Sequence, residues 1–413
     1  MKKILLLLSI ISILSCSKDN EIDNNEQNDD FSVIEFSSVP ITKTNSTPIY
    51  VHYMPWFESP EYAEYPNTQM GNWGQHWTMA TRNPENIVNG KREIASHFYP
   101  LIGPYDNGEP DYCEYAAVCM KLSGLDGILI DYAGITEVYD WKLLHDHTLA
   151  ILPYLKKAGL KFGIVYEDSS LKNAFEQSII TDKVEEGKRV LKYIENNFFS
   201  ESNYFKFNNK PVFLNFGPQA IFTNDEWNSI FSEIQEIHFL PLAYHGDYYD
   251  LTTSANGAFA WVGETINNDF YNYCSNFEYC IGGAMPEFKD FYQEGGWGNG
   301  FTDYESNNGL LFEETLERSK LNDVDAIQVI TWNDFGEGTI IEPTVEFGYS
   351  RLEQLQTFLG VNYSSNELSL AVQLYEKRKE HKGKELEYKK LDQVFYYLIS
   401  LQLDEARNLL NEL

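Results

Sequence analysis

The sequence predicts an α/β protein, a (β/α)8 (TIM) barrel with a helical extension at its C-terminal end. Short apolar runs of strand type alternate with amphipathic stretches of helical period. Eight such runs occur between residues 47 and 336, which is the number of strands that a barrel needs. No G-x-G-x-x-G follows the first run and no phosphate loop occurs, so an open, nucleotide-binding sheet is disfavoured.

The expected elements follow one another in a regular order. Each expected strand is a short apolar run: 47–55, 126–134, 161–168, 210–217, 239–246, 257–264, 281–288 and 325–336. The clearest helices between them cover 111–124, 145–159, 181–199 and 310–323. Two of these helices stop at a glycine, Gly124 and Gly159, just ahead of a buried strand. Residues 47–360 are therefore expected to form the barrel, and two helical patterns in 361–413, broken near Lys382-Gly383, predict a helical hairpin.

The N-terminal 46 residues are predicted to lie outside the folded domain. Residues 1–15 begin with two lysines and continue as a mostly apolar run, which is typical of a secretory signal peptide. The sequence Ile13-Leu14-Ser15-Cys16 resembles a bacterial lipobox, so we expect lipidation of Cys16 and anchoring to a membrane. Residues 16–46 are rich in Asp, Asn, Glu and Ser and are expected to form a disordered tether. The prediction is an outer-membrane lipoprotein, at the cell surface or on the periplasmic face, with simple secretion as the alternative.

Charge and aromatic content restrict the partners. The formal net charge is −31, whereas a nucleic-acid-binding protein needs a basic surface to replace the phosphate counterions. We therefore expect no nucleic-acid partner and a neutral substrate, although the acidic charge also serves simply to keep a protein soluble. Aromatic residues make up 15 % of the chain, and carbohydrate-binding clefts use flat rings with a polar edge.

Four cysteines remain once Cys16 is set aside. Cys113 and Cys119 fall in an expected helix, where their spacing places them about 9 Å apart along the axis, too far to bridge. Cys274 and Cys280 lie in a loop-like stretch, where a disulfide and two free thiols are both open. The sequence has no Cys/His clustering of metal-binding type, so we expect neither a metal nor another cofactor.

Carboxylates at the ends of the expected strands are the candidates for catalysis, because the loops after these ends build the active site of a barrel. The last strand ends in TWNDFGEGTIIEP, residues 331–343, where Asp334 and Glu337 stand three apart among glycines. Hydrolysis of a glycosidic bond needs one carboxyl group as proton donor and a second, ionised one on the other side. Glu287 and Asp290 are a competing pair, and the structural alternative for Asp334 is a turn-forming residue that caps its own backbone.

At these residues the chain resembles glycoside hydrolase family 99 and its relative, family 71. The segment from Asn333 through Glu337-Gly338-Thr339 to Glu342-Pro343 follows the family 99 pattern, but that family has Glu where Asp334 stands. The WNDFGE portion is closer to family 71, whose members read Trp-Asn-Asp-Tyr-Gly-Glu. Further matching stretches are VHYMPWF, GNWGQHW, HFYPLIGPYD and GILIDY, so the resemblance spreads over residues 47–355.

The resemblance implies an activity and assigns roles by position. Family 99 implies retaining, endo-acting hydrolysis of α-mannosides, in which a carboxylate removes the proton from the sugar's own 2-hydroxyl group. Asp334 matches this base, and Glu337 matches the acid that protonates the leaving group. Family 71 implies α-1,3-glucan as the substrate, and the missing methylene at Asp334 leaves the stereochemical outcome open.

Residues expected to bind the substrate lie at motif positions or strand ends: Tyr53, His76, Trp77, His97, Tyr105, Asp131, Tyr166 and Asn333. For the tyrosines a packed core position is an equal alternative. The predicted function is a glycoside hydrolase that cleaves α-linked poly- or oligosaccharides. An α-1,3-glucanase and a non-catalytic glycan-binding surface lipoprotein are the alternatives.

Overall fold

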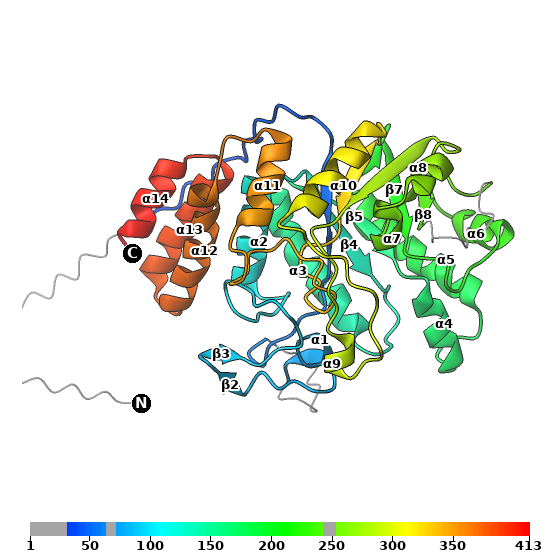
Figure 1. Cartoon of the computed structure of the whole chain (residues 1–413), viewed down its shortest axis with the longest axis horizontal. Helices are drawn as coiled ribbons and strands as arrows, with labels where there is room; N and C mark the ends of the chain where they lie inside the picture. Colours follow the sequence, from blue (N-terminus) through cyan, green and yellow to red (C-terminus); the bar gives the residue numbers. More distant parts are fainter. Residues whose placement is uncertain (1–30, 63–71, 243–252) are drawn as a thin grey trace, which may run out of the picture. The chain divides into compact units, whose positions relative to one another are not determined.

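A curled sheet of mainly parallel strands lies at the centre of the molecule (Figure 1), in a computed structural model that describes residues 31–62, 72–242 and 253–413. Along the sheet the strand order is β6-β7-β5-β4-β1-β11-β10-β9, with β8 also paired to β7. The strands are β1 (Ile49–Tyr53), β2 (Ile87–Val88), β3 (Lys91–Arg92), β4 (Gly127–Tyr132), β5 (Lys161–Tyr166), β6 (Lys206–Phe207), β7 (Lys210–Asn215), β8 (His238–Pro241), β9 (Gly257–Phe259), β10 (Tyr279–Ala284) and β11 (Ala326–Val329). The short strands β2 and β3 form a separate hairpin.

Each of the eight predicted apolar runs contains a strand: β1, β4, β5, β7, β8, β9, β10 and β11. Neighbours pair in parallel from β8 through β7, β5, β4, β1, β11 and β10 to β9. A parallel bridge between Leu242 and Phe259 connects the end of β8 with β9. The run 257–264 is only partly strand, because it turns into a short helix at Val262. The fold class is thus confirmed as α/β, with a curled parallel sheet and covering helices.

Helices follow most of the strands and cover the sheet. Their bounds are α1 (Gly74–Thr78), α2 (Pro110–Ser123), α3 (Trp141–Ala158), α4 (Ser169–Glu176), α5 (Lys183–Ile194), the π-helical turn η2 (Glu195–Phe199), α6 (Asn224–Phe231), α7 (Val262–Thr265), α8 (Asn268–Cys274), α9 (Tyr292–Gly295), α10 (Leu310–Leu321), α11 (Ser350–Leu359), α12 (Ser365–Glu380), α13 (Glu385–Ile399) and α14 (Leu403–Asn411). The predicted stops of α2 and α3 are confirmed, since Gly124 and Gly159 have φ of 89° and 76° at their C-caps. No helix in the described ranges is long and apolar enough to cross a membrane.

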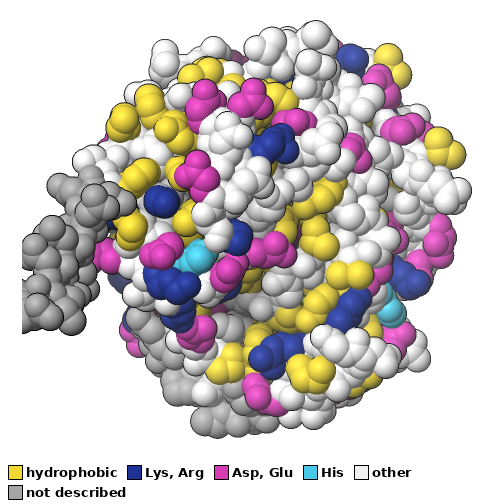
Figure 2. Space-filling model, turned by 90° about the vertical axis from the view of Figure 1, so that its left-hand side faces the viewer, with side chains coloured by type: hydrophobic (Ala, Val, Ile, Leu, Met, Phe, Trp, Pro, Cys, Tyr) yellow, Lys and Arg dark blue, Asp and Glu magenta, His cyan; other side chains and the backbone are white. Residues whose placement is uncertain are grey.

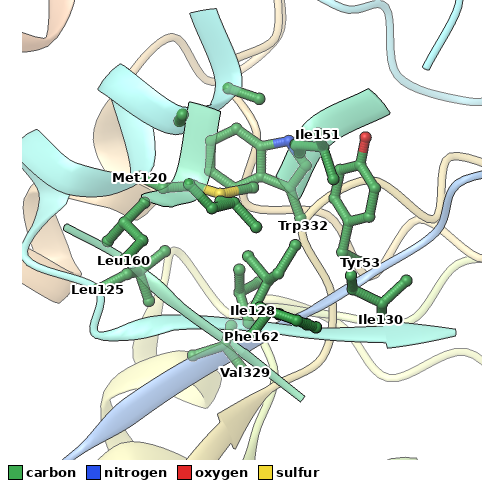
Figure 3. Close-up of a cluster of buried hydrophobic side chains, with 14 of the residues drawn as sticks. Tyr53, Met120, Leu125, Ile128, Ile130, Ile151, Leu160, Phe162, Val329 and Trp332 are labelled. Atoms are coloured by element: carbon green, nitrogen blue, oxygen red, sulfur yellow. The ribbon is translucent and has the colours of Figure 1, made fainter. Parts of the chain in front are cut away.

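Side chains alternate between the two faces of the sheet. On β4, Ile128 and Ile130 belong to the large core against the helices, where Figure 3 shows them near Phe162, whereas Leu129 belongs to a second cluster. This second cluster takes alternate residues from each strand of the sheet: Tyr50, Leu129, Val165, Val212, Leu214, Leu240, Phe259, Tyr279, Ile281 and Ala326 are among them. It fills the concave face of the curled sheet. The same alternation decides which residues reach the space above the strand ends.

The last three helices form the C-terminal extension. The predicted break is present, because Gly383, with a φ of 83°, separates α12 from α13. The chain then turns again at Leu401, so the expected hairpin gains a third helix, α14. Arg378 of α12 connects this extension to the barrel through an ion pair of 2.8 Å with Glu114 of α2. Figure 2 shows this side of the molecule, where acidic, basic and hydrophobic side chains are interspersed.

Part of the expected tether is bound to the folded domain. Residues 33–46, called the strap below, run over the surface instead of remaining disordered. Their backbone is held by Gln393, Ile399 and Leu359, which accept hydrogen bonds of 2.6 to 3.0 Å from Ile34, Val39 and Asn45. The reason is the sequence of the strap itself, in which apolar residues recur and pack against the core: Val33, Phe36 and Ile41.

The cysteines of the described chain divide into a bonded and a free pair. Cys274 and Cys280 form a disulfide with a Cα–Cα distance of 5.6 Å. Cys113 and Cys119 are free and buried in α2, as their spacing predicted. Cys16 and the predicted signal peptide lie outside the described residues.

Candidate active site

A cavity of about 280 Å³ lies among the residues that follow the carboxyl ends of the strands. Four carboxyl groups line it: Asp131, Glu167, Asp334 and Glu337. Aromatic and imidazole rings form much of the remaining wall: His52, Trp56, Phe57, His76, Phe216, Trp261, Tyr292 and Trp297. The cavity therefore combines the acids that glycoside hydrolysis needs with rings that can pack against sugars.

The alternation of side chains between the two faces of the sheet brings several of these residues into the cavity. Asp131 continues the register of Leu129 on the concave face, and Glu167 continues that of Val165. His52, Phe216 and Trp261 follow the same rule on their own strands. Because side chains two residues apart share a face, parallel strands direct these residues to one place.

The loop after β11 is fastened to the end of β1 by Asn333. Its side-chain oxygen accepts a hydrogen bond of 2.9 Å from Met54 N, and its amide nitrogen donates one of 2.9 Å to Met54 O. The same amide donates to the hydroxyl of Tyr105 at 3.2 Å, which in turn donates to Glu342 at 2.6 Å. Asn333 thus fixes the backbone immediately before Asp334.

Asp334 caps its own loop and also lines the cavity. Its Oδ1 accepts a hydrogen bond of 2.9 Å from Glu337 N, and its carbonyl oxygen accepts one of 2.9 Å from Gly338 N. Gly338 has a φ of 69°, a conformation that favours glycine, and it allows this tight turn. The turn-forming and cavity-lining interpretations of Asp334 therefore describe the same arrangement.

The two carboxyl groups of this loop have different environments. Burial raises the pKa of Asp334 to about 6, although the Glu337 backbone N–H and the nearby His76 favour its ionised form. Burial and the charge of Asp334 raise the pKa of Glu337 further, to about 8. Glu337 Oε1 accepts a hydrogen bond of 3.0 Å from the hydroxyl of Tyr292, while its buried Oε2 has no partner in the described chain. At neutral pH, Asp334 is mainly ionised and Glu337 mainly protonated.

Asp131 and Glu167 form a second pair of carboxyl groups in the cavity. Burial, together with Glu167 and Asp334, raises the pKa of Asp131 well above its ordinary value. Burial raises the pKa of Glu167 to about 7, and Ser169 donates a hydrogen bond of 2.9 Å to its Oε2. Like charges in one buried space oppose each other's ionisation, so the protonation of Asp131 and Glu167 depends on that of Asp334 and Glu337.

His76 places an imidazole in the cavity wall. Its ring stacks on Trp56 with centroids 4.2 Å apart and an interplanar angle of 4°. Its Nε2 lies 3.4 Å from Asp140 Oδ2, an oxygen that also accepts a hydrogen bond from Gln75. The positive charge of a protonated His76 lowers the pKa of Asp334.

Of the ten residues predicted for catalysis or substrate binding, the structure brings four together in the cavity: His76, Asp131, Asp334 and Glu337. The other six lie outside its lining: Tyr53, Trp77, His97, Tyr105, Tyr166 and Asn333. Tyr53 and Tyr166 occupy the strand face that packs against the helices. Trp77 is buried and donates a hydrogen bond to the Tyr105 carbonyl, and His97 Nε2 lies 3.1 Å from the carbonyl oxygen of Asp290.

The competing acidic pair lies outside the lining of the cavity. Glu287 forms a buried ion pair with Arg351 of α11. Asp290 accepts hydrogen bonds from the backbone N–H groups of Tyr292 and Phe301. Both residues therefore hold protein groups in place.

Sequence reasoning missed several cavity residues. Phe216 and Trp261 carry a usable signal, because they continue the concave-face register two residues beyond Leu214 and Phe259. Tyr292 lies in the short helix after β10, and Trp297 in the loop that follows, where no periodicity marks the side chains that turn inward.

Comparisons with solved structures agree with this fold. Two structures of the GH99 endo-α-mannosidase from Bacteroides thetaiotaomicron, one in complex with BIS-TRIS-propane, align with a TM-score of 0.57 at 16 % identity. The alignments cover 80 % and 82 % of this chain, and 99 % and 100 % of the other. A glycoside hydrolase-like protein aligns with a TM-score of 0.53 at 14 % identity, over 78 % of this chain and 97 % of its own. No protein-family model and no curated protein matches the sequence. The resemblance predicted from the motifs is thereby confirmed at the level of the fold.

Proposed function

We propose that this protein is a glycoside hydrolase that cleaves α-linked glycans, with α-mannosides as the first candidate substrates. The observation that carries the proposal is the unequal environment of Asp334 and Glu337 in one cavity. With pKa values of about 6 and about 8, one group is ionised and the other protonated at neutral pH. An acid and a base separated in this way are what glycoside hydrolysis requires. The fold shared with an endo-α-mannosidase supports the same assignment.

In this proposal Glu337 is the general acid. It gives its proton to the glycosidic oxygen while the bond between C1 and that oxygen breaks. Asp334 takes the proton of the 2-hydroxyl group on the same sugar, and the freed O2 forms a bond to C1. Water then attacks C1 and gives a proton to the ionised Glu337. The bond between C1 and O2 breaks in this step, and O2 regains its proton from Asp334. Both carboxyl groups return to their starting states.

The shorter side chain at Asp334 supports a second candidate substrate. Relative to Glu, the carboxylate is withdrawn by about 1.5 Å, the length of one carbon–carbon bond, and its Oδ1 is tied to Glu337 N. A carboxylate withdrawn in this way would favour attack by a water molecule, and therefore inversion, over attack by the sugar's own 2-hydroxyl group. Together with the WNDFGE motif it supports α-1,3-glucan as the alternative to α-mannoside. Following the product anomer by NMR separates retention from inversion.

Two further parts of the proposal concern the whole chain. We propose that the sheet closes into a complete (β/α)8 barrel, which the bridge between Leu242 and Phe259 supports. We also propose an outer-membrane lipoprotein anchored through Cys16, supported by its lipobox-like sequence. A Cys16→Ala variant is expected to leave the membrane fraction, whereas its retention there would contradict the anchor.

The test of the catalytic assignment uses Glu337→Gln and Asp334→Asn, assayed on α-mannan and α-1,3-glucan oligosaccharides. Each variant is expected to lose at least about 100-fold in kcat, because general acid or base catalysis contributes that much or more. Glu314→Gln on α10 and Asp225→Asn on α6 are exposed matched controls. Undiminished hydrolysis by both cavity variants would refute the assignment. A wild-type protein that binds these glycans and cleaves none would indicate a glycan-binding protein instead.

A further inference from the structure

Aromatic side chains at the edge of the cavity are unusually exposed. Trp297 is 42 % exposed although it lines the cavity, and Phe301, four residues further on, is 71 % exposed. Leaving large rings in water is unfavourable, and exposed aromatic groups that continue a cavity commonly mark a binding surface.

These rings form a continuous series that begins inside the cavity. Tyr292 packs against Trp297 with ring centroids 6.2 Å apart and an interplanar angle of 23°. Tyr292 also meets Phe301 edge to face, with centroids 6.1 Å apart. Trp297 also meets His76 edge to face, with ring centroids 5.8 Å apart. The series therefore leads from the buried wall of the cavity towards solvent.

The segment that carries the rings is held in one conformation. Asp290 anchors both of its ends, since Oδ1 accepts a hydrogen bond of 3.0 Å from Tyr292 N and Oδ2 one of 2.6 Å from Phe301 N. Between these anchors, Trp297 N donates to Tyr292 O at 2.8 Å, and Ala80 N donates to Gly295 O at 2.8 Å. Rings that are fixed before a ligand arrives lose little entropy on binding.

The hydroxyl of Tyr292 gives this series a direction. It donates a hydrogen bond of 3.0 Å to Glu337 Oε1. Under the function proposed above, Glu337 contacts the glycosidic oxygen that leaves with the departing part of the substrate. Sugars that lie along Tyr292, Trp297 and Phe301 are therefore those on the leaving-group side.

The charge around the series restricts the sugars that fit. Among the described residues that line the cavity, four carry a carboxyl group and none is Lys or Arg. An anionic sugar would meet the ionised Asp334 and no Lys or Arg among these lining residues, whereas the C–H faces of a neutral hexose pack against flat rings.

We infer that Tyr292, Trp297 and Phe301 form a binding platform for neutral sugar units on the leaving-group side of the scissile bond. The inference rests on the proposed function and deepens it: the substrate is a neutral glycan that extends at least two units beyond the bond that is cleaved. The platform makes the protein selective for an internal bond of a chain over the bond to a small aglycone.

The test compares two substrates that share the same non-reducing sugars. One carries two or more neutral hexoses on the leaving-group side, and the other carries a small aryl aglycone. In Trp297→Ala and Phe301→Ala, the ratio of kcat/KM for the oligosaccharide to kcat/KM for the aryl glycoside is expected to fall about 10- to 100-fold. Trp297→Phe, which keeps a flat ring, is expected to recover most of the wild-type ratio. Phe175→Ala, at an exposed ring on α4, is the matched control and is expected to keep it.

The outcomes separate this inference from the proposed function. An unchanged ratio in both alanine variants of an active enzyme would overturn the platform while leaving the hydrolase proposal intact. If the wild-type protein cleaves neither substrate, the hydrolase proposal fails. Saturation-transfer NMR with α-mannobiose and α-1,3-linked glucobiose then tests whether the platform binds sugars. A signal lost in Trp297→Ala supports a saccharide platform, and an equal or absent signal overturns it.

Discussion

Replacing Glu337 by glutamine is expected to stabilise the protein at alkaline pH while abolishing its activity. Burial and Asp334 raise the pKa of Glu337 from its ordinary 4.5 to about 8. Between these two values the folded state holds a proton that the unfolded state releases. The free energy of unfolding of the wild type therefore falls as the pH rises from 4.5 to 8. Glutamine has no proton to lose, so the variant avoids this fall.

The size of the effect follows from the same pKa values. Each pKa unit corresponds to about 1.4 kcal/mol, so the rise from 4.5 to about 8 sets an upper limit of about 5 kcal/mol on the gain at pH 8. At pH 4.5 the protonated carboxyl and the amide are both neutral. Glutamine can still accept the Tyr292 hydrogen bond, so the two proteins are expected to agree within about 1 kcal/mol there.

Urea unfolding followed by tryptophan fluorescence at pH 5 and pH 8 measures the difference. The midpoint of Glu337→Gln is expected to exceed that of the wild type at pH 8 and to approach it at pH 5. Glu314→Gln, at an exposed position on α10, should match the wild type at both pH values. A difference between Glu337→Gln and the wild type that is the same at both pH values would refute the buried, protonated state of Glu337.

Three further predictions follow from the site and the strap. The pH profile of kcat/KM is expected to be bell-shaped, rising near pH 6 as Asp334 ionises and falling near pH 8 as Glu337 loses its proton; a flat profile across this range would contradict the assigned roles. Tyr105→Phe removes the hydroxyl that donates a hydrogen bond to Glu342, so the free energy of unfolding measured in urea should fall by about 1 to 3 kcal/mol. An unchanged midpoint would mean that water replaces the hydroxyl. Lys121→Met removes the ammonium group that donates hydrogen bonds to the strap and to Ala158 O. The free energy of unfolding should therefore fall by about 2 kcal/mol in the same measurement. Activity at 25 °C is the control and should stay at the wild-type level.

The sequence located the strands well but could not show which side chains face the cavity. Strands of a parallel sheet covered by helices are apolar on both faces, so the period-two signal of a half-exposed strand is absent. On β4 the apolar residues Ile128, Leu129 and Ile130 follow one another, and only the folded sheet separates their directions. For this reason the sequence predicts substrate binding by Tyr53 and Tyr166 as well as by Asp131, although both tyrosines end their strands on the helix-facing side.

The motif after β11 could be found because its signal is local. Asp334 and Glu337 are three residues apart, and the glycines beside them indicate a tight turn. The contribution of Tyr292 and Trp297 could not be found in this way, because they reach the cavity from a different loop. The strap was also missed, since apolar residues spaced along an otherwise polar segment gain a partner only when the core and the C-terminal helices are in place.

The bond between Asn333 and the backbone of Met54 joins residues 279 positions apart in the chain. Closing so long a loop is entropically costly, and it occurs only when β1 and β11, the first and last strands along the chain, pair with each other. During synthesis the four carboxyl groups therefore do not share one cavity until β11 has emerged and docked on β1. A chain that ends before residue 334 lacks two of these four groups, so their mutual repulsion arises only after β1 to β10 have been synthesised.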